Sequence, residues 1–191
     1  MNTLDFKPFE FPGDNWLVDI YEKHSKLVDK YLEYEGQIES FDINTYEDQS
    51  LLKNYLEVRF IEELCEALDD RDNRDHFLEE MIDAFNFLIA AYYIYEIKPE
   101  QLSFKVNPSK GFDKDFLNVI VSTGMVCNCL KNRPWRHSQY LVDLLVFENR
   151  FLKLWEDFYS LLRNLNIDDK TIYEQWSLKY QVNLFRIETN Y

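Results

Sequence analysis

Residues 61–95 read IEELCEALDDRDNRDHFLEEMIDAFNFLIAAYYIY, and this stretch contains two pairs of carboxylates with the same three-residue spacing. The first pair is Glu63 and Glu66, and the second is Glu80 and Asp83. On an α-helix, residues three apart lie on one face with their Cβ atoms about 5–6 Å apart. Two antiparallel helices joined by the short polar segment between the pairs would therefore bring four carboxylates together.

The sequence around these carboxylates is strongly apolar. The segment from Ala84 to Tyr95 is apolar nearly all round, which is typical of a helix buried within a bundle. Asp83, at the start of that segment, is therefore expected to be partly buried. Clustered buried carboxylates repel one another and resist ionisation unless a cation neutralises them. In a chain with 35 acidic residues, one such pair taken alone is most simply a solvated helix face. The apolar residues around both pairs favour a site instead.

The ligand atoms offered by this quartet indicate which metal would suit it. Four carboxylates without His or Cys are hard oxygen ligands, which suit Mg²⁺, or alternatively Mn²⁺, rather than zinc or a His-bearing di-iron centre. The pattern predicts a metal site whose ligands are Glu63, Glu66, Glu80 and Asp83. Such a site favours metal-assisted phosphate chemistry.

The composition of the whole chain predicts a single all-α domain. The length of 191 residues fits one domain with a substantial core, and 46% apolar and 17% aromatic residues exclude a disordered chain. Only four Gly and five Pro interrupt long helical patterns, which favours a compact bundle of about six helices. We expect one domain over residues 1–191, with residues 1–13 as an extended N-terminal arm.

Hydrophobic periodicity and helix breakers predict the individual helices. Gly36 is expected to end the first helix, Pro99 to stop the third, and Asp168 to cap the N-terminus of the last. The helices are expected at residues 15–34, 48–68, 74–97, 113–130, 137–165 and 168–188.

Charge and cysteine content exclude several classes of partner and location. The net charge of −14 argues against a duplex-binding surface, since affinity for nucleic acid rests largely on neutralising phosphates. No basic and apolar leader is visible, and no apolar run is long enough to span a membrane. Three cysteines, an odd number without metal-ligand spacing, are expected to be reduced. We therefore expect a cytoplasmic protein that binds neither nucleic acid nor membrane.

A second group of polar residues lies in the last predicted helix. Lys179, Asn183 and Arg186 are spaced i, i+4 and i+7, which places them on one stripe of a helix. An arginine fork and a lysine point charge on one stripe are able to hold a polyphosphate. The alternative is that these cations only complement the helix dipole near its C-terminus.

Taken together, the acidic pairs and the last helix resemble the all-α nucleoside triphosphate pyrophosphatases, and most closely the dimeric dUTPases and phage dCTP pyrophosphatases. That family pairs Glu-x-x-Glu on one helix with Glu-x-x-Asp on the next, and ends in Tyr-x-x-Lys-Asn-x-x-Asn-x-x-Arg-Gln-x-x-Gly-Tyr. Here the acidic quartet fills the four positions, and the last helix keeps the spacing with Lys179, Asn183, Arg186 and Tyr191. The resemblance implies the all-α architecture shared by MazG proteins and dimeric dUTPases.

Several positions depart from the family pattern. Trp176 stands for the leading Tyr, Tyr180 for the Asn after Lys, and Asn86 for a common His in the second acidic motif. The family reads its pyrimidine with a Gln and an Asn on the first helix. The counterparts in this chain are His24, Ser25 and Val28, so uracil specificity has no support from the sequence.

The resemblance implies Mg²⁺-dependent hydrolysis of a deoxynucleoside triphosphate, dUTP or dCTP, to the monophosphate and pyrophosphate. Glu63 is the expected base for the attacking water, and Lys179 and Arg186 are expected to stabilise the leaving pyrophosphate. The substrate-binding residues expected from the resemblance are Lys179, Asn183, Arg186, Asn86 and Tyr191.

Two alternatives remain open from the sequence. One is a pyrophosphatase for another or a modified nucleotide, and the other is a helical nucleotide-binding or interaction protein without turnover. The resemblance and the rich aromatic content also predict a homodimer. Its interface is expected on the helices at residues 113–165, through Phe116, Leu141, Leu144, Leu145 and Phe147.

Overall fold

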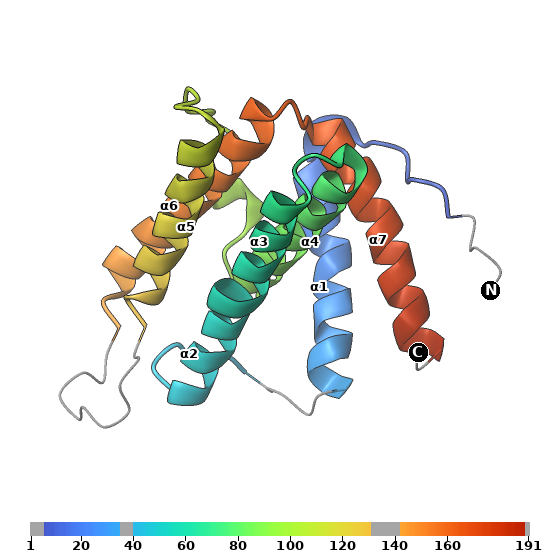
Figure 1. The fold of residues 1–191 in the computed structure, drawn as a ribbon. Coiled ribbons are helices and arrows are strands. Elements are labelled where there is room, and N and C mark those ends of the chain that lie inside the picture. The colour runs from blue at the N-terminus through green and yellow to red at the C-terminus, as the bar shows by residue number, and fades with distance from the viewer. Residues whose placement is uncertain (1–5, 35–39, 131–141, 190–191) are drawn as a thin grey trace. The chain divides into compact units, whose positions relative to one another are not determined.

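The computed structural model describes residues 6–34, 40–130 and 142–189, and these residues form helices and loops with no strand. The predicted all-α class is therefore confirmed. The chain divides into two compact units, one made of Met1–Glu39 with Asp168–Tyr191 and the other of Ser40–Ile167 (Figure 1). Within the described residues, no helix has the length and apolar character needed to cross a membrane.

The first unit is built on two long helices, α1 (Trp16–Tyr34) and α7 (Asp169–Thr189), which pack against each other. Tyr173 of α7 donates a hydrogen bond from its hydroxyl to Asp19 Oδ2 of α1 at 2.7 Å. Asp168 accepts a hydrogen bond from the Thr171 backbone N–H at 2.8 Å, which confirms it as the N-cap of α7. The buried apolar residues of the two helices include Trp16, Leu17, Ile20, Leu27, Val28, Ile172 and Trp176.

The extended segment before α1 lies along α7. The Phe9 backbone N–H donates to Ser177 Oγ at 3.0 Å, and the Phe9 ring meets the rings of Trp176 and Tyr180 edge-on at 6.5 and 6.2 Å. Gly13 then adopts φ +65°, a conformation that side-chain-bearing residues rarely take, and opens the 3-10 turn η1 (Gly13–Asn15). The arm is thus attached to the helix that carries the predicted phosphate-binding stripe.

The second unit begins with a continuous helical rod. It comprises α2 (Tyr46–Lys53), the π-helical segment η2 (Asn54–Phe60) and α3 (Ile61–Asp69), so the predicted helix at 48–68 is present with a π-helical middle. Thr45 caps its start by accepting a hydrogen bond from the Asp48 backbone N–H at 3.2 Å. Counted as one rod, these segments give six continuous helices in the described parts of the chain, as the sequence predicts.

Three further helices complete this unit: α4 (Arg74–Ile94), α5 (Phe112–Cys127) and α6 (Leu144–Asn164). The neighbours α3 and α4 pack together, as do α5 and α6, in agreement with Figure 1. Tyr92 of α4 stacks on Phe151 of α6 with ring centroids 4.3 Å apart, and its hydroxyl donates to the Phe151 carbonyl at 2.8 Å. The largest fully buried side chains of the unit include Phe60, Phe85, Tyr92, Phe116, Phe147, Phe151, Trp155 and Phe158.

The end of α4 differs from the prediction. The helix stops at Ile94, and Glu96 takes a left-handed conformation with φ 64° while the Ile97 backbone N–H bonds to the Tyr92 carbonyl at 2.9 Å. This reversal satisfies the last helical carbonyls and ends the helix before Pro99 is reached. Pro99 instead begins the short 3-10 turn η3 (Pro99–Gln101).

The start of α6 also differs from the prediction. Val142 and Asp143 are not helical, and Asp143 caps α6 by accepting a hydrogen bond from the Val146 backbone N–H at 3.1 Å. A helix from residue 137 is therefore not continuous into α6. Gly36 and Leu141, which the sequence analysis singled out, lie outside the described residues.

A cavity of about 600 Å³ lies between the loop after η3 and the helices α5 and α6. Its polar groups largely bond to one another, as when Ser122 Oγ donates to Asp157 at 2.6 Å and Asn107 Nδ2 donates to Glu156 at 2.8 Å. None of the predicted site residues lines it. The cavity is therefore separate from the acidic quartet.

Candidate active site

The first acidic pair is held by α3, which follows the π-helical segment without a break. The apolar side of α3 is anchored by Phe60, Leu64 and Ala67, all fully buried. Anchoring this side leaves Glu63 only 8% exposed, whereas Glu66 one turn later is exposed. The two carboxylates of one motif therefore lie in different surroundings, which the spacing alone does not reveal.

The second acidic pair is held by α4, which follows α3 after a tight turn. The turn closes through a hydrogen bond from the Asn73 backbone N–H to the Asp70 carbonyl at 2.8 Å, and α4 then packs against α3. Glu80 and Asp83 are half-buried on this helix. The predicted pair of helices joined by a short turn is therefore present.

The structure brings three of the four predicted ligands to one point. Glu63, Glu66 and Glu80 each offer a carboxylate oxygen, and these oxygens lie within 4.8 Å of one another. Asp83 is not part of that triplet, but its charge acts strongly on both Glu63 and Glu80. The quartet thus consists of a convergent triplet with a fourth carboxylate beside it.

The pKa of Glu63 is raised by burial and by the neighbouring carboxylates. Burial raises its pKa from 4.5 to about 7, and the charge of Asp83 is the next largest cause. A hydrogen bond with Glu80 also raises the pKa of Glu63 and lowers that of Glu80. Burial and the Asp83 charge nevertheless leave the pKa of Glu80 above its ordinary value. These carboxylates repel one another, and a bound cation would relieve that repulsion.

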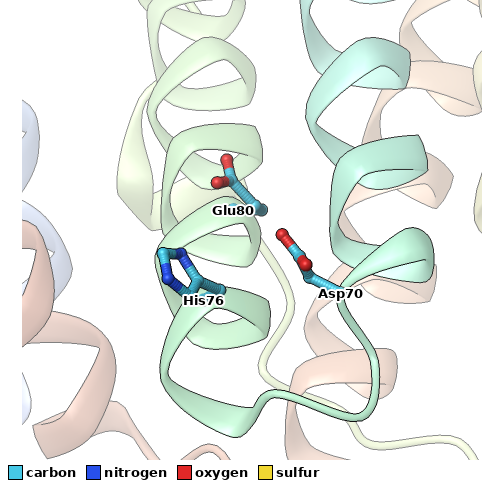
Figure 2. Close-up of side chains that lie close together, drawn as sticks. All are labelled: Asp70, His76 and Glu80. Atoms are coloured by element: carbon cyan, nitrogen blue, oxygen red, sulfur yellow. The ribbon is translucent and has the colours of Figure 1, made fainter.

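A second group of ligand atoms shares Glu80 with the quartet, and the spacing of the acidic pairs does not predict it (Figure 2). Asp70 at the end of α3 and His76 and Glu80 on α4 offer atoms within 4.8 Å of one another. From the sequence, His76 is a lone histidine that is expected at the surface or core edge, and its side chain is indeed exposed. Its four-residue spacing from Glu80 is the one local sign of the group, because Asp70 joins it only through the fold of the turn.

Asn86 is the predicted substrate residue on α4. It is buried, and its Nδ2 donates a long hydrogen bond to Asp83 Oδ1 at 3.4 Å. In this arrangement the amide orients the fourth carboxylate of the quartet.

The three predicted phosphate-binding residues lie in the other compact unit, on α7. Lys179 and Asn183 are half-buried, Arg186 is exposed, and their spacing places them on one stripe of the helix. Arg186 lies close enough to Tyr31 of α1 for its charge to act on the pKa of that phenol. Tyr191 lies outside the described residues.

Comparison with known families places most of the chain in one of them. The sequence pattern that defines the dUTPase family matches residues 67–191. The chain belongs to the dUTPase family. The matched part of this dUTPase-family protein contains Glu80, Asp83 and the α7 stripe, whereas Glu63 and Glu66 precede it. No curated protein and no solved structure matches the chain.

Membership of the dUTPase family gives the general class of activity. The family implies a hydrolase that acts on nucleoside triphosphates, so a nucleotide is the class of substrate. Family membership also accounts for the all-α architecture of the described residues.

Proposed function

We propose that this protein hydrolyses a deoxynucleoside triphosphate, dUTP or dCTP, to the monophosphate and pyrophosphate with Mg²⁺, for which Mn²⁺ is an alternative. The observation that carries the proposal is the convergence of Glu63, Glu66 and Glu80 on one point beside Asp83. A cluster of carboxylates with raised pKa values is stable in its ionised form only with a compensating positive charge.

The quartet fits a hard divalent cation on chemical grounds. All its donors are carboxylate oxygens, and none is a thiolate or an imidazole. We propose that Glu63, Glu66, Glu80 and Asp83 hold the metal. When bound, Mg²⁺ would neutralise phosphate oxygens and make the attacking water more acidic.

Glu63 is our candidate for the general base. It is nearly buried, and in the metal-free protein burial and the charge of Asp83 raise its pKa to about 7. A bound cation would lower that pKa and leave Glu63 ionised, which is the state in which a general base accepts a proton. We propose that its carboxylate takes the proton of the attacking water, with Glu80 beside it as a further ligand of the metal. Asn86 holds Asp83 by donating to it, and we propose that its amide also contacts the nucleotide.

We propose that α7 supplies the charge that binds the triphosphate. Arg186 offers a planar fork for two phosphate oxygens and Lys179 a point charge, while Asn183 orients phosphate or sugar. Tyr191 is the remaining proposed contact to the substrate. The part of the chain that matches the dUTPase family includes these four positions, which supports the proposal.

The base preference is proposed only as pyrimidine. Of the three residues in the base-reading positions of α1, His24 and Val28 are buried, and Ser25 Oγ donates to the Glu22 carbonyl at 3.0 Å. None of them is the Gln or Asn of the family pattern, which keeps another or a modified nucleotide as the alternative substrate. A non-catalytic nucleotide-binding role is the second alternative.

Pyrophosphate release tests the activity directly. The protein should be incubated with Mg²⁺ and each of the common dNTPs and NTPs, and the pyrophosphate and monophosphate formed should be quantified. We expect release from dUTP, dCTP or both, and none after the metal is removed with a chelator. Binding of nucleotides without any release would support the non-catalytic alternative.

We also propose a homodimer, with a correction to the expected interface. Phe116 and Phe147 are buried within the chain and are therefore unavailable to a partner. Leu144 and Leu145 of the expected interface are exposed at the start of α6, as is Val146. Leu117, Val121 and Met125 form a further exposed apolar stripe on α5. An unpartnered apolar stripe of this kind is typical of an interface.

Light scattering at micromolar concentration tests the dimer. We expect twice the chain mass of 23.2 kDa for the unsubstituted protein and a single-chain mass for Val121→Glu. Val58→Glu, at an exposed position on η2, is the matched control and should remain dimeric. A single-chain mass for the unsubstituted protein would rule out the dimer.

A further inference from the structure

Arg59 is the one arginine of the π-helical segment and lies one turn before Glu63. Its Nη1 donates to Glu62 Oε2 at 2.6 Å, and its Nη2 lies 3.8 Å from Glu63 Oε1. Its guanidinium carbon lies over the ring of Phe87, 4.9 Å from the centroid. One side chain thus contacts two acids on α3 and an aromatic ring on α4.

Phe87 lies on the same face of α4 as two carboxylates of the quartet. Phe87 follows Asp83 by four residues and Glu80 by seven, so all three lie on the same face of α4. The ring is also met edge-on by Tyr55 of η2 at a centroid distance of 6.1 Å. The guanidinium therefore connects the two helices that carry the quartet, about one turn away from the carboxylates on each.

The guanidinium lies closer to Glu62 than to Glu63, at 2.6 Å against 3.8 Å. Glu62 takes the short, charge-assisted hydrogen bond, whereas Glu63 stays beyond hydrogen-bonding distance. At 3.8 Å the Arg59 charge lies beside Glu63 without a hydrogen bond, so it leaves Glu63 Oε1 available to a ligand. Glu62 and Phe87 fix the guanidinium from two sides.

We propose that Arg59 is a positioning residue for the acidic quartet: clamped by Glu62 and Phe87, it holds Glu63 against α4 at the spacing that one divalent cation requires. The inference deepens the proposed metal-dependent function and rests on it. A contact between Arg59 and the substrate phosphate is the competing role, and it predicts a different kinetic result.

The experiment compares Arg59→Met, Phe87→Leu and the double variant with Arg71→Met, an exposed arginine of the α3–α4 turn, as the matched control. Mg²⁺ affinity is measured by calorimetry without nucleotide, and kcat and KM are measured at saturating Mg²⁺. We expect each single variant to weaken Mg²⁺ binding about tenfold, the scale found for residues that orient metal ligands. The double variant should be no weaker than the singles, because both remove one clamp.

Two further readouts separate positioning from general damage. Arg59→Lys keeps a cation over the ring and should bring the Mg²⁺ affinity back to within about threefold of the unsubstituted protein. KM for the nucleotide should change by less than about twofold in Arg59→Met, because the residue does not touch substrate. Arg71→Met should leave all three quantities unchanged.

The outcomes that overturn the proposal are distinct from those that overturn the activity. Unchanged Mg²⁺ affinity in Arg59→Met rejects the clamp, and a large rise in KM with unchanged Mg²⁺ affinity assigns Arg59 to substrate binding instead. Additive effects of the two single variants also reject it. If the variants show the expected Mg²⁺ affinities but no nucleotide is hydrolysed, the hydrolytic function fails and the positioning role stands.

Discussion

The acidic quartet on α3 and α4 and the polar stripe on α7 each carry like charges, but the separations between those charges differ. Glu63, Glu66 and Glu80 offer oxygens within 4.8 Å of one another, and burial adds to their repulsion. Lys179 and Arg186 are seven residues apart, which is about 10 Å along a helix and comparable with the screening length in physiological salt. The α7 cations therefore repel each other only weakly, and the protein is stable without a bound anion at this stripe.

The different spacing of like charges determines how each region depends on its ligand. The carboxylates of the quartet repel one another, and a bound cation relieves this repulsion. Metal binding should therefore raise the free energy of unfolding. A bound ion should add little stability at the α7 stripe. Substitutions there should change kcat/KM for the nucleotide and leave the stabilisation by metal unchanged. Four predictions, from the largest expected effect to the smallest, test this distinction.

The largest effect is expected from removing one carboxylate of the quartet. Glu66→Gln and Asp83→Asn keep the size of the side chain but remove a metal ligand, so turnover should fall below detection while circular dichroism shows unchanged helical content. Asp69→Asn, at an exposed position at the end of α3, is the control and should retain activity. Full activity in either quartet variant would show that the metal site is assigned to the wrong residues.

The next effect is expected from the α7 stripe. Arg186→Ala should lower kcat/KM by about 2–4 kcal/mol, the scale of one preorganised charge donor to a transition state. Lys170→Ala is the control on the same helix, since Lys170 forms only an exposed ion pair with Glu174 at 3.6 Å. Deletion of residues 179–191 should remove activity, and a folded truncated protein with the full rate would contradict this role of α7.

The third prediction separates the two regions through metal binding. Mg²⁺ at about one hundred times its dissociation constant should stabilise the native state by about 2.7 kcal/mol, which raises Tm by about 5–10 °C for a chain of this size. Asp83→Asn should lose this shift, and Arg186→Ala should keep it. An equal loss in both variants would show that the stripe is as dependent on the metal as the quartet.

The smallest effect is expected from pH in the absence of metal. The pKa of Glu63 is raised from 4.5 in the unfolded chain to about 7 in the folded protein, so its contribution to stability is present below pH 4.5 and is lost as pH rises towards 7. The upper limit of this contribution is about 3 kcal/mol, at 1.36 kcal/mol for each unit of pKa, and solvent screening beside the exposed Glu66 reduces it to about 1–2 kcal/mol. Denaturant unfolding of the metal-free protein between pH 4.5 and 8 measures it, and Glu63→Gln should remove this part of the pH dependence.

Most of the fold follows from local sequence patterns. The spacing of apolar residues gave every helix of the described residues within a few positions at most boundaries, because a helix depends mainly on contacts three and four residues apart. The cap at Asp168 is equally local. The end of α4 at Ile94 was not predicted, because Glu96 is a residue type that seldom takes the left-handed conformation.

The candidate site was predicted less completely than the fold. The four acids were identified from spacing, but the group of Asp70 with His76 and the contact of Arg59 with Phe87 were not. Each of these depends on how α3 is placed against α4. The expected interface failed at Phe116 and Phe147 for a related reason, because periodicity does not show which apolar residues a neighbouring helix covers.

Residue types and their spacing within a helix were enough to predict the all-α class, the family resemblance and the identity of the four clustered acids. The packing of α3 against α4 was needed to show that Glu63 is buried while Glu66 is exposed, and that the guanidinium of Arg59 contacts both Glu62 and Phe87. Burial, pKa and cross-helix contact depend on what a second helix places nearby. No periodicity within one helix contains that information.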